Sequence, residues 1–408
     1  MKKLNVHLTN SLGIKILVGT LAQIDHRIVF EYANSFLDTG LQISPYYLPL
    51  REGLFETNKS YLLNLPGVFN DSLPDGWGML LMDRFFTKTK LNPITLSALD
   101  RLAYLGSDTM GALTYEPAMT KEYQRLLDLS KLARECQKIV SGSTTSVLEE
   151  LYIAGGSPGG ARPKVCVGLK DDQMAVLAGD SFDGFEAWII KFPAHQDHSD
   201  IGRVEYIYSL LAKQAGLTIT ETRLFDVPKT GSFFGIKRFD RTSQGRIHAH
   251  TFGNLIQADF RIPGTSYETF LKVTYDLTKS YEDLLMAFRY LCFNIIFNNR
   301  DDHTKNFSFL LDAQGQWHLS PAYDLCFSEG MGGEHFMTIQ GEGTAITKKH
   351  LTALAKEMGI KTNDKKEILD QVMASASKWD SHAKEYGINA KTKNKIANNI
   401  KKNMSKAL

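Results

Sequence analysis

The start of the sequence lacks a continuous apolar segment. The stretch "MKKLNVHLTNSLG" carries two lysines and then alternates apolar and polar residues, whereas a signal peptide or a membrane-spanning helix requires an uninterrupted apolar run. We therefore expect a protein with no membrane contact that resides in the cytoplasm.

Cysteine is scarce, with four residues in a chain of 408. Cys136, Cys166, Cys292 and Cys326 stand far apart and show no paired spacing. This argues against a zinc site and against a disulfide framework. We expect all four to be buried, reduced thiols.

Net charge is also small, at +2, but it is distributed unevenly. Residues 345–408 contain 14 Lys and 6 Asp or Glu, a net +8, which leaves −6 for the rest of the chain. A basic segment of this kind is typical of solvated lysine-rich helices or of a surface that attracts nucleic acid, and the sequence leaves both open.

What is present is ordinary for a folded protein: 43% hydrophobic and 23% charged residues, in a chain long enough for two or three packed units. Alternating runs within residues 4–32 predict antiparallel strands, and "FNDSLPDGWGMLLMDRFF" predicts a capped helix after a Pro-Asp-Gly turn. Further strands are expected at 164–170, 174–178, 186–193, 217–227 and 233–240, with a helix at 203–217. From about residue 250 the pattern is mostly helical, which gives an α+β class.

A polar loop follows the apolar run "FRYLCFNIIF". In "NNRDDHTKNF", Asp301 and Asn306 stand in a D-x-x-x-x-N relation. That spacing matches the catalytic loop of phosphotransferases, in which the acid accepts the proton of the attacking hydroxyl and the amide helps to hold Mg²⁺. A solvent-facing capped loop would supply the same residue types. Asp324 in "SPAYDLC" could complete an oxygen-rich magnesium site with Asn306.

Glycines and cations precede the strand at 164–170 in "IAGGSPGGARPKV". Such glycines let successive backbone N–H groups converge on an anion, and Arg162 and Lys164 add positive charge, although a glycine hinge would look similar. Lys191 ends a predicted strand and Glu205 opens the next helix, as in the lysine–glutamate pair of kinases. The stretch "GIKRFDR" could present its backbone to an adenine edge. His248 and His250 lack a third ligand nearby, and we expect both to be structural.

Together these stretches resemble the HipA family, the serine/threonine-kinase toxins of bacterial type II toxin–antitoxin modules. "FNDSLPDGWGMLLMDR" and "YLGSDTMGALTYEP" are similar to the family's N-terminal subdomain, and "GGSPGGARPKV", "IIKFP", "KRFDR", "RDDHTKNFS" and "SPAYDL" are similar to its kinase core. The resemblance covers nearly the whole chain. It implies a two-lobed, protein-kinase-like (HipA / PI3-4-kinase-like) fold with three parts: a small β-rich N-terminal subdomain (1–125), a kinase N-lobe with the nucleotide loop (126–240) and a helical C-lobe with the catalytic loop (241–408).

The resemblance also implies roles for individual residues. Asp301 is the expected catalytic acid, with Asn306 and Asp324 as magnesium ligands and Glu205 supporting Lys191. The residues expected to bind ATP are Gly159, Gly160, Ala161, Arg162, Pro163, Lys164, Lys191, Lys237, Arg238, Phe239, His303, Thr304, Lys305, Asn306, Tyr323 and Asp324. Ser157 matches the serine that the family autophosphorylates. A phosphate there would add roughly two negative charges beside the glycines and repel ATP. Arg162 and Pro163 depart from members that carry Gln-Glu before the loop lysine.

The expected activity is ATP- and Mg²⁺-dependent phosphorylation of a serine or threonine on a protein. The family implies an aminoacyl-tRNA synthetase as that protein, growth arrest as the outcome, and neutralisation by a HipB-like antitoxin with a helix-turn-helix that binds operator DNA. Two alternatives stay open. One is a small-molecule or lipid kinase of related fold. The other is a co-repressor module that acts mainly in an operator complex, with DNA contact through the basic C-terminal region.

Overall fold

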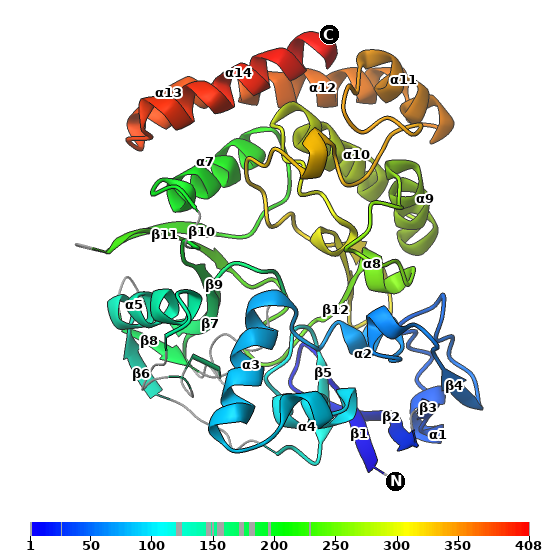
Figure 1. The fold of residues 1–408 in the computed structure, drawn as a ribbon. Helices are drawn as coiled ribbons and strands as arrows, with labels where there is room; N and C mark the ends of the chain where they lie inside the picture. The colour runs from blue at the N-terminus through cyan, green and yellow to red at the C-terminus, as the bar shows by residue number, and fades with distance from the viewer. Residues whose placement is uncertain are drawn as a thin grey trace.

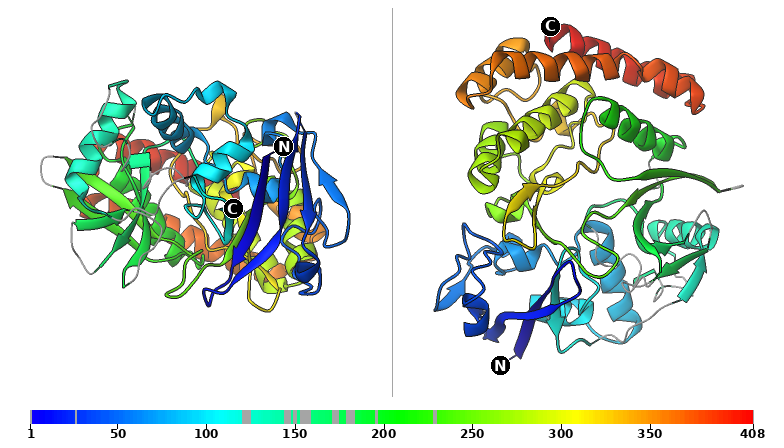
Figure 2. Two further views of the ribbon diagram at one scale, coloured as in Figure 1. Left: turned by 90° about the horizontal axis from the view of Figure 1, so that it is seen from below. Right: turned by 180° about the vertical axis from the view of Figure 1, so that it is seen from behind.

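Three antiparallel sheets and a layer of helices build the molecule in the computed structural model. The structure describes residues 2–25, 27–119, 125–143, 148, 151–152, 159–170, 175–178, 184–194, 197–227 and 230–407. The N-terminal sheet and the six-stranded sheet lie side by side beneath the C-terminal helices (Figure 1), and the view from below shows the same arrangement (Figure 2).

The first sheet has five strands in the order β4-β3-β2-β1-β5. Its strands are β1 (Lys2–Thr9), β2 (Lys15–Ile24), β3 (Arg27–Tyr32), β4 (Leu54–Glu56) and β5 (Leu113–Glu116), accompanied by α1 (Asn34–Leu37), η1 (Ser60–Leu62), α2 (Gly67–Asn70), α3 (Gly76–Lys88), η2 (Pro93–Thr95) and α4 (Ala98–Leu105). In β1, Leu4, Val6 and Leu8 are buried, as the alternating sequence requires. The strands predicted within 4–32 are confirmed.

The second sheet has six strands in the order β10-β11-β9-β7-β8-β6. Its strands are β6 (Arg125–Asp128), β7 (Lys164–Leu169), β8 (Ala175–Ala178), β9 (Glu186–Lys191), β10 (Thr222–Val227) and β11 (Gly231–Lys237), with helices α5 (Leu129–Val140) and α7 (Ile201–Gln214). All six residues of the central strand β7 are buried. The helix and the five strands predicted between residues 164 and 240 are confirmed.

The remaining residues form a lobe that is not purely helical. It contains a three-stranded sheet of β12 (His248–Thr251), β13 (Ser308–Leu311) and β14 (Trp317–Leu319). Its helices are α8 (Phe252–Leu255), α9 (Tyr267–Thr278), α10 (Tyr281–Ile296), η3 (Thr304–Asn306), η4 (Met331–Gly333), α11 (Lys348–Glu357), α12 (Thr362–Ala376), α13 (Trp379–Glu385) and α14 (Ala390–Ala407). The short strands β12 and β13 were not predicted from the sequence.

Helix α10 is the stem that supports the polar loop. Ser280 caps it by accepting a hydrogen bond from the Asp283 N–H at 3.1 Å. Every residue from Tyr290 to Ile296 is buried. A helix that is apolar on all sides packs inside the protein, so the loop that follows starts from a fixed point in the C-lobe.

Two further expectations concern the core and the membrane. All four cysteines are buried and free, as predicted. Within the part of the chain that the structure describes, no helix combines the length and apolarity needed to cross a lipid bilayer.

Candidate active site

The described residues enclose a cleft made of two adjoining cavities. The inner cavity, about 170 Å³, has largely apolar walls, and the outer cavity, about 590 Å³, includes Asp301. The titratable residues that line both are Asp75, Lys164, Lys191, His303, Lys305 and Asp324. A charged junction therefore separates an apolar pocket from a more polar chamber.

The loop after α10 supplies Asp301 to the outer cavity. The Asn306 side-chain amide donates to the backbone carbonyl of Asp301 at 2.6 Å and so closes the loop on itself. The pKa of Asp301 is raised, first because the cleft walls withdraw water from the carboxyl, and also because Asp324 adds negative charge; Arg162 acts in the opposite direction. A carboxyl with a raised pKa is a better proton acceptor than an ordinary aspartate.

The neighbouring acid, Asp302, has a different role. It is fully buried and accepts hydrogen bonds from the Tyr267 hydroxyl at 2.5 Å and the Phe336 N–H at 2.7 Å. The His335 Nδ1 lies 2.8 Å from the same carboxylate. Asp302 therefore anchors the loop to α9 and to the segment after residue 333. Of the two neighbouring acids, Asp301 lines the cleft and Asp302 does not.

The Asp324 side chain contacts Lys191, the last residue of β9. The Lys191 ammonium donates to the Asp324 carboxylate at 2.6 Å and also to Glu205 of α7. The predicted pairing of Lys191 with Glu205 is thus present. Coulombic attraction to Asp324 and Glu205 raises the pKa of Lys191 despite its burial, and the cations Lys191 and Lys164 hold the pKa of Asp324 well below its usual range. Asp324 has a φ of +56°, a conformation that non-glycine residues seldom adopt.

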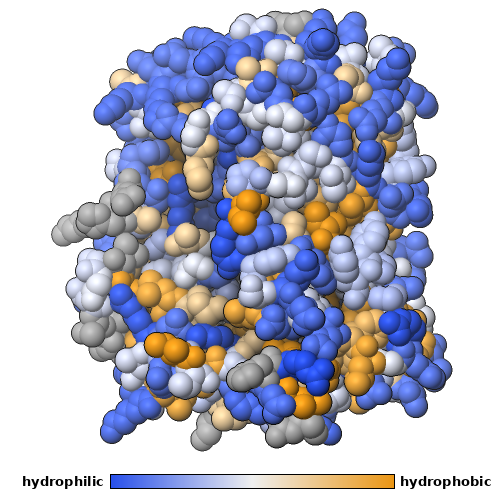
Figure 3. Space-filling view, turned by 45° about the vertical axis from the view of Figure 1, so that its right-hand side comes forward, coloured by the Kyte–Doolittle hydropathy of each residue, from blue (hydrophilic) through white to orange (hydrophobic). Residues whose placement is uncertain are grey.

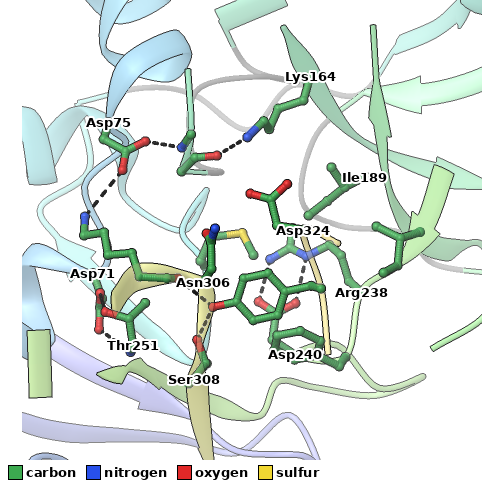
Figure 4. Close-up of a pocket in the computed structure, with 18 of the residues that line it drawn as sticks. Asp71, Asp75, Lys164, Ile189, Arg238, Asp240, Thr251, Asn306, Ser308 and Asp324 are labelled. Carbon is green, nitrogen blue, oxygen red and sulfur yellow. Dashed lines mark hydrogen bonds and ion pairs between the residues drawn. The ribbon is translucent and has the colours of Figure 1, made fainter. Parts of the chain in front are cut away.

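Two tyrosines tie the two acidic loops together. The Tyr290 hydroxyl of α10 donates to the Asn306 carbonyl at 3.2 Å and the Tyr323 carbonyl at 2.8 Å. The Tyr323 hydroxyl lies 2.6 Å from Ser308 Oγ and donates to the Lys305 carbonyl at 2.7 Å. Asn306 and Asp324 consequently lie at the same end of the cleft, near Asp75 and Lys164 (Figure 4).

The glycine-rich stretch before β7, which we call the glycine loop, is described from residue 159 onward. It is hydrogen-bonded to residues 1–125, which we call the N-terminal unit. The Asp75 carboxylate accepts a hydrogen bond from the Gly160 N–H, and the Trp77 N–H donates to the Gly160 carbonyl at 3.1 Å. The Trp77 indole N–H donates to the Lys164 carbonyl at 2.9 Å. A Cβ on Gly76, whose φ is +29°, would lie 2.7 Å from the Ala161 Cα, so only glycine permits this approach.

This contact corrects one expectation. The helix predicted after the Pro-Asp-Gly turn is α3, but its N-cap residue, Asp75, makes no side-chain cap hydrogen bond to it. The carboxylate instead bonds to the glycine loop and lies 3.6 Å from the Lys305 ammonium. Asp75 therefore bonds to a loop that is distant in the sequence instead of to the first turn of its own helix.

The stretch "GIKRFDR", which we expected to face adenine, contributes to the apolar end of the cleft. Ile189, Ile236, Phe239 and Tyr323 line the inner cavity, with the rings of Phe239 and Tyr323 5.7 Å apart. The Arg238 side chain, which also lines this cavity, forms a buried ion pair with Asp240 at 2.7 Å. Arg238 and Arg241 hold the pKa of Asp240 well below its usual range.

A second contact between the N-terminal unit and the C-lobe surrounds Asp71. Its carboxylate accepts from the Thr251 hydroxyl at 2.7 Å and from the Asn254 amide at 2.6 Å, and it lies 2.5 Å from His250 Nδ1. His248 is also buried, and burial lowers its pKa to about 4. Both histidines therefore occupy structural positions, as expected.

The donor set around Asp324 is consistent with magnesium bound together with phosphates. Within the described residues, no group of three or more His, Cys, Asp or Glu could hold a metal ion. The oxygen donors that could hold an ion here are the Asp324 carboxylate and the Asn306 carboxamide oxygen. Mg²⁺ commonly takes one or two protein oxygens and completes its shell with water and phosphate oxygens, so these two side chains fit the ion only when a phosphate is also present.

Most of the predicted site residues line the cleft. The inner cavity is lined by Gly159, Gly160, Lys164, Lys191, Lys237, Arg238, Phe239, His303, Lys305, Asn306, Tyr323 and Asp324, and the outer cavity adds Ala161, Arg162 and Asp301. Neither Pro163 nor Thr304 lines a cavity; both are buried beside it. Glu205 lies behind Lys191. Ser157 lies outside the described residues. The sequence did not reveal Asp71, Asp75 or Trp77 as part of the site, because their partners are far away along the chain.

Known proteins resemble this chain over most of its length. The protein named "Putative kinase Y4dM" from Sinorhizobium fredii is 25% identical over 362 residues, 83% of this chain and 81% of that protein. The HipA structure in the Shewanella oneidensis complex of HipA, HipB and operator DNA aligns with a TM-score of 0.72 at 16% identity, over 99% of this chain and 96% of that one. The kinase CtkA of Helicobacter pylori aligns with a TM-score of 0.40 at 13% identity, over 61% of this chain and 90% of that one. The HipA likeness confirms the predicted fold class.

Family models match both parts of the chain. Residues 8–116 match the HipA N-terminal domain, and residues 156–379 match the HipA-like C-terminal domain. The second match alone covers more than half of the sequence, and the two occur in the order that the motifs predicted. This chain belongs to the HipA family.

Proposed function

We propose that this protein is an ATP-dependent kinase that transfers the γ-phosphate to a serine or threonine of a protein. The observation that carries this proposal is the charged junction of the cleft, where Lys164, Lys191 and Lys305 line both cavities together with Asp324, between an apolar pocket and the chamber of Asp301. The three ammonium groups, close to Asp301, Asp324 and the Asn306 amide, form a site that suits a triphosphate better than a neutral ligand.

The nucleotide would lie along the cleft in one direction. The apolar inner cavity, with Ile189, Ile236 and Phe239, suits the adenine ring. The triphosphate would then reach the junction, where the ammonium groups of Lys191 and Lys305 offset its charge. The γ-phosphate would end in the outer cavity, because Asp301 lines only that one.

Asn306 and Asp324 are the residues that would hold magnesium. The ion, when bound, supplies positive charge to the phosphate oxygens. For Asp324 to serve as a ligand, its carboxylate must share or exchange its contact with Lys191. Lys191 stays anchored by Glu205, so its ammonium remains in reach of the phosphates.

Asp301 would act on the acceptor. The oxygen of a serine or threonine hydroxyl attacks the γ-phosphorus, the bond from that phosphorus to the β–γ bridging oxygen breaks, and ADP leaves. The hydroxyl proton passes to the Asp301 carboxylate. Positioning by the rigid α10 stem and the buried Asp302 anchor supplies the orientation on which such transfers depend.

Autophosphorylation provides the test. Incubation of the full chain with γ-labelled ATP and Mg²⁺ should label Ser157, and the Ser157→Ala chain should lose that label. The Asp301→Asn chain should label nothing, since it lacks the proton acceptor. If a small metabolite or lipid becomes labelled while no protein does, the small-molecule or lipid kinase is the correct function.

The biological target and the partner are part of the same proposal. The family resemblance supports an aminoacyl-tRNA synthetase as the protein acceptor and growth arrest as the outcome. The likeness to the Shewanella HipA over 99% of the chain supports a HipB-like antitoxin that carries the helix-turn-helix and places the complex on operator DNA. We also propose unit boundaries near residues 125 and 240, because each described sheet falls within one of the resulting ranges, apart from Arg125 at the start of β6.

A co-repressor role would involve the basic C-terminal region. Lys393, Lys395 and Lys401 lie on α14, where Lys395 pairs with Glu329 at 2.7 Å and Lys401 lies 3.8 Å from Asp380. Changing these lysines to Glu should weaken operator binding by the complex in a salt-dependent manner. Lys88→Glu in α3 is the control. Unaltered binding at low salt would exclude DNA contact through α14.

A further inference from the structure

The wall of the outer cavity opposite Phe260 belongs to the N-terminal unit. Its contributors there include Tyr61, Leu63 and Met79. The two walls are joined directly, because the Tyr61 hydroxyl donates to the Gln257 carbonyl at 2.7 Å. The chamber that Asp301 lines is therefore formed by residues of both units, which this hydrogen bond joins.

Leu63 is the unusual residue of this wall. Its φ of +55° and ψ of +31° place a bulky side chain in the left-handed region, and the next residue, Asn64, also has a positive φ of +59°. Leucine seldom adopts this conformation. Burial does not explain it either, because Leu63 remains 42% exposed. Neither the local backbone nor the core accounts for a leucine at this position.

The surrounding structure holds this turn firmly. The Leu63 N–H donates to the Ser60 carbonyl at 2.9 Å, and the Asn64 N–H donates to the Lys59 carbonyl at 3.0 Å. The buried Asn70 amide donates to the Leu62 carbonyl at 3.0 Å. Leu63 is thus presented to the cavity by a rigid turn, in the manner of a recognition residue.

The walls of the outer cavity combine polar and apolar surface. Asn70, Arg162, Arg261 and Asp301 contribute polar side chains, and Leu63, Pro74, Met79 and Phe260 contribute apolar surface. A polypeptide presents backbone polar groups together with apolar side chains, so it can use both kinds of wall. Ile262, two positions after Phe260 in the chain, is 63% exposed, and hydrophobic side chains are exposed at mid-height of the molecule (Figure 3).

We infer that the outer cavity binds a polypeptide segment and that Leu63 selects an apolar side chain next to the phosphorylated serine or threonine. This inference rests on the proposed kinase function and adds the side-chain preference of the same site. The N-terminal unit then forms part of the acceptor site, in addition to holding the glycine loop.

A positional-scanning peptide library tests the assignment. The full chain, γ-labelled ATP and Mg²⁺ are incubated with peptides that have a central serine or threonine and one varied flanking position. Discrimination by an apolar pocket typically reaches about tenfold in kcat/KM, so we expect about a tenfold preference for Leu, Ile or Met over Ser or Asp at one flanking position. Leu63→Asn should reduce this preference to below about twofold, because Asn tolerates the left-handed backbone and removes the apolar contact. ATP binding, measured as thermal stabilisation by ATP with Mg²⁺, should not change.

The control is Leu54→Asn in β4, which replaces a leucine that is 63% exposed and lines neither cavity; it should keep the full preference. If the parent chain phosphorylates peptides and Leu63→Asn keeps the same preference, Leu63 has no role in selection, while the kinase proposal stands. If the parent chain phosphorylates no peptide or protein but labels a lipid in phosphatidylinositol vesicles or a soluble metabolite, both the inference and the protein-kinase proposal are wrong.

Discussion

Replacement of Lys191 by Met should destabilise the protein in a pH-dependent way. The Lys191 side chain is 12% exposed, and its ammonium neutralises Glu205, 4% exposed, and Asp324, 31% exposed. Removing one partner of a buried ion pair costs about 3–5 kcal/mol. Because Asp324 is partly exposed and screened by solvent, we expect the lower end, about 3 kcal/mol. For a unit of 150–250 residues, this corresponds to a fall in Tm of roughly 6–12 °C.

The dependence on pH follows from Glu205. Burial already raises the pKa of this carboxyl, and Lys191 is the first opposing influence. In the Lys191→Met variant the folded pKa therefore rises further above the unfolded value. A carboxyl of this kind does not destabilise the fold below the unfolded pKa, near 4.3, and it destabilises increasingly as pH rises toward the folded pKa. Loss of Lys191 also raises the depressed pKa of Asp324, and that part of the deficit is present throughout pH 4.5–8. The deficit should therefore be smaller near pH 4.5 and largest near pH 8.

Thermal unfolding of both chains across pH 4.5–8 measures this effect. The double variant Lys191→Met/Glu205→Gln should recover a large part of the lost Tm at pH 8 but no kinase activity, because it removes the buried charge without restoring the cation. Lys237→Met is the matched control, since Lys237 pairs with Glu186 at the surface, with side chains 37% and 46% exposed, and should change stability by less than about 1 kcal/mol. An unchanged Tm at pH 8, or a deficit that grows toward acid, would refute this reasoning.

The remaining predictions concern the acids and cations of the cleft. Asp301→Asn should reduce phosphotransfer by about 10²- to 10⁴-fold with an unchanged Tm; retained activity would contradict the proton-acceptor role. Asp324→Ala should abolish the thermal stabilisation by ATP with Mg²⁺, which in the parent reaches about 2.7 kcal/mol at a hundredfold excess over Kd, and persistent stabilisation would remove Asp324 from the metal site. Arg162→Gln should move the acid limb of the kcat–pH profile to higher pH, because Arg162 lowers the pKa of Asp301; a shift to lower pH would show the opposite coupling. Asp75→Asn keeps an oxygen acceptor for the glycine loop but frees Lys305 from its anionic partner, so the KM for ATP should fall by about fivefold, equivalent to roughly 1 kcal/mol, and a rise would assign Asp75 a purely supporting role.

Residues that are close in sequence were the ones that sequence analysis placed well. Asp301 and Asn306, the residues of the proposed catalytic loop, are separated by only a few positions, and a short loop at the end of a buried helix keeps such residues together. The pairing of Lys191 with Glu205 was predictable for a related reason, because a strand followed by a helix that packs on it brings the end of one to the start of the other. Local connectivity determines both arrangements.

The contributions of the N-terminal unit were not predictable in the same way. Asp75 follows a proline and precedes a glycine, so its local sequence indicates a turn and a helix cap. Its actual partner is the N–H of Gly160, 85 positions away. No periodicity or spacing records a contact across that distance. The short strands β12 and β13 were missed for a similar reason, since each has four residues and is stabilised by pairing with a distant segment rather than by its own pattern.

The N-terminal unit and the kinase core depend on one another for their polar groups as well as for their packing. Asp71 is the acceptor for Thr251 and Asn254 of the core, and Trp77 donates to the backbone of Lys164, at the start of the central strand β7. A core without residues 1–125 would leave these donors and acceptors without partners, and each buried polar group that loses its partner costs about 1–3 kcal/mol. The same contacts hold the described part of the glycine loop beside the cations of the cleft. The stability of the core and the geometry of its proposed nucleotide site therefore have a common source in the turn at residues 71–77, and a change in that turn should affect both together.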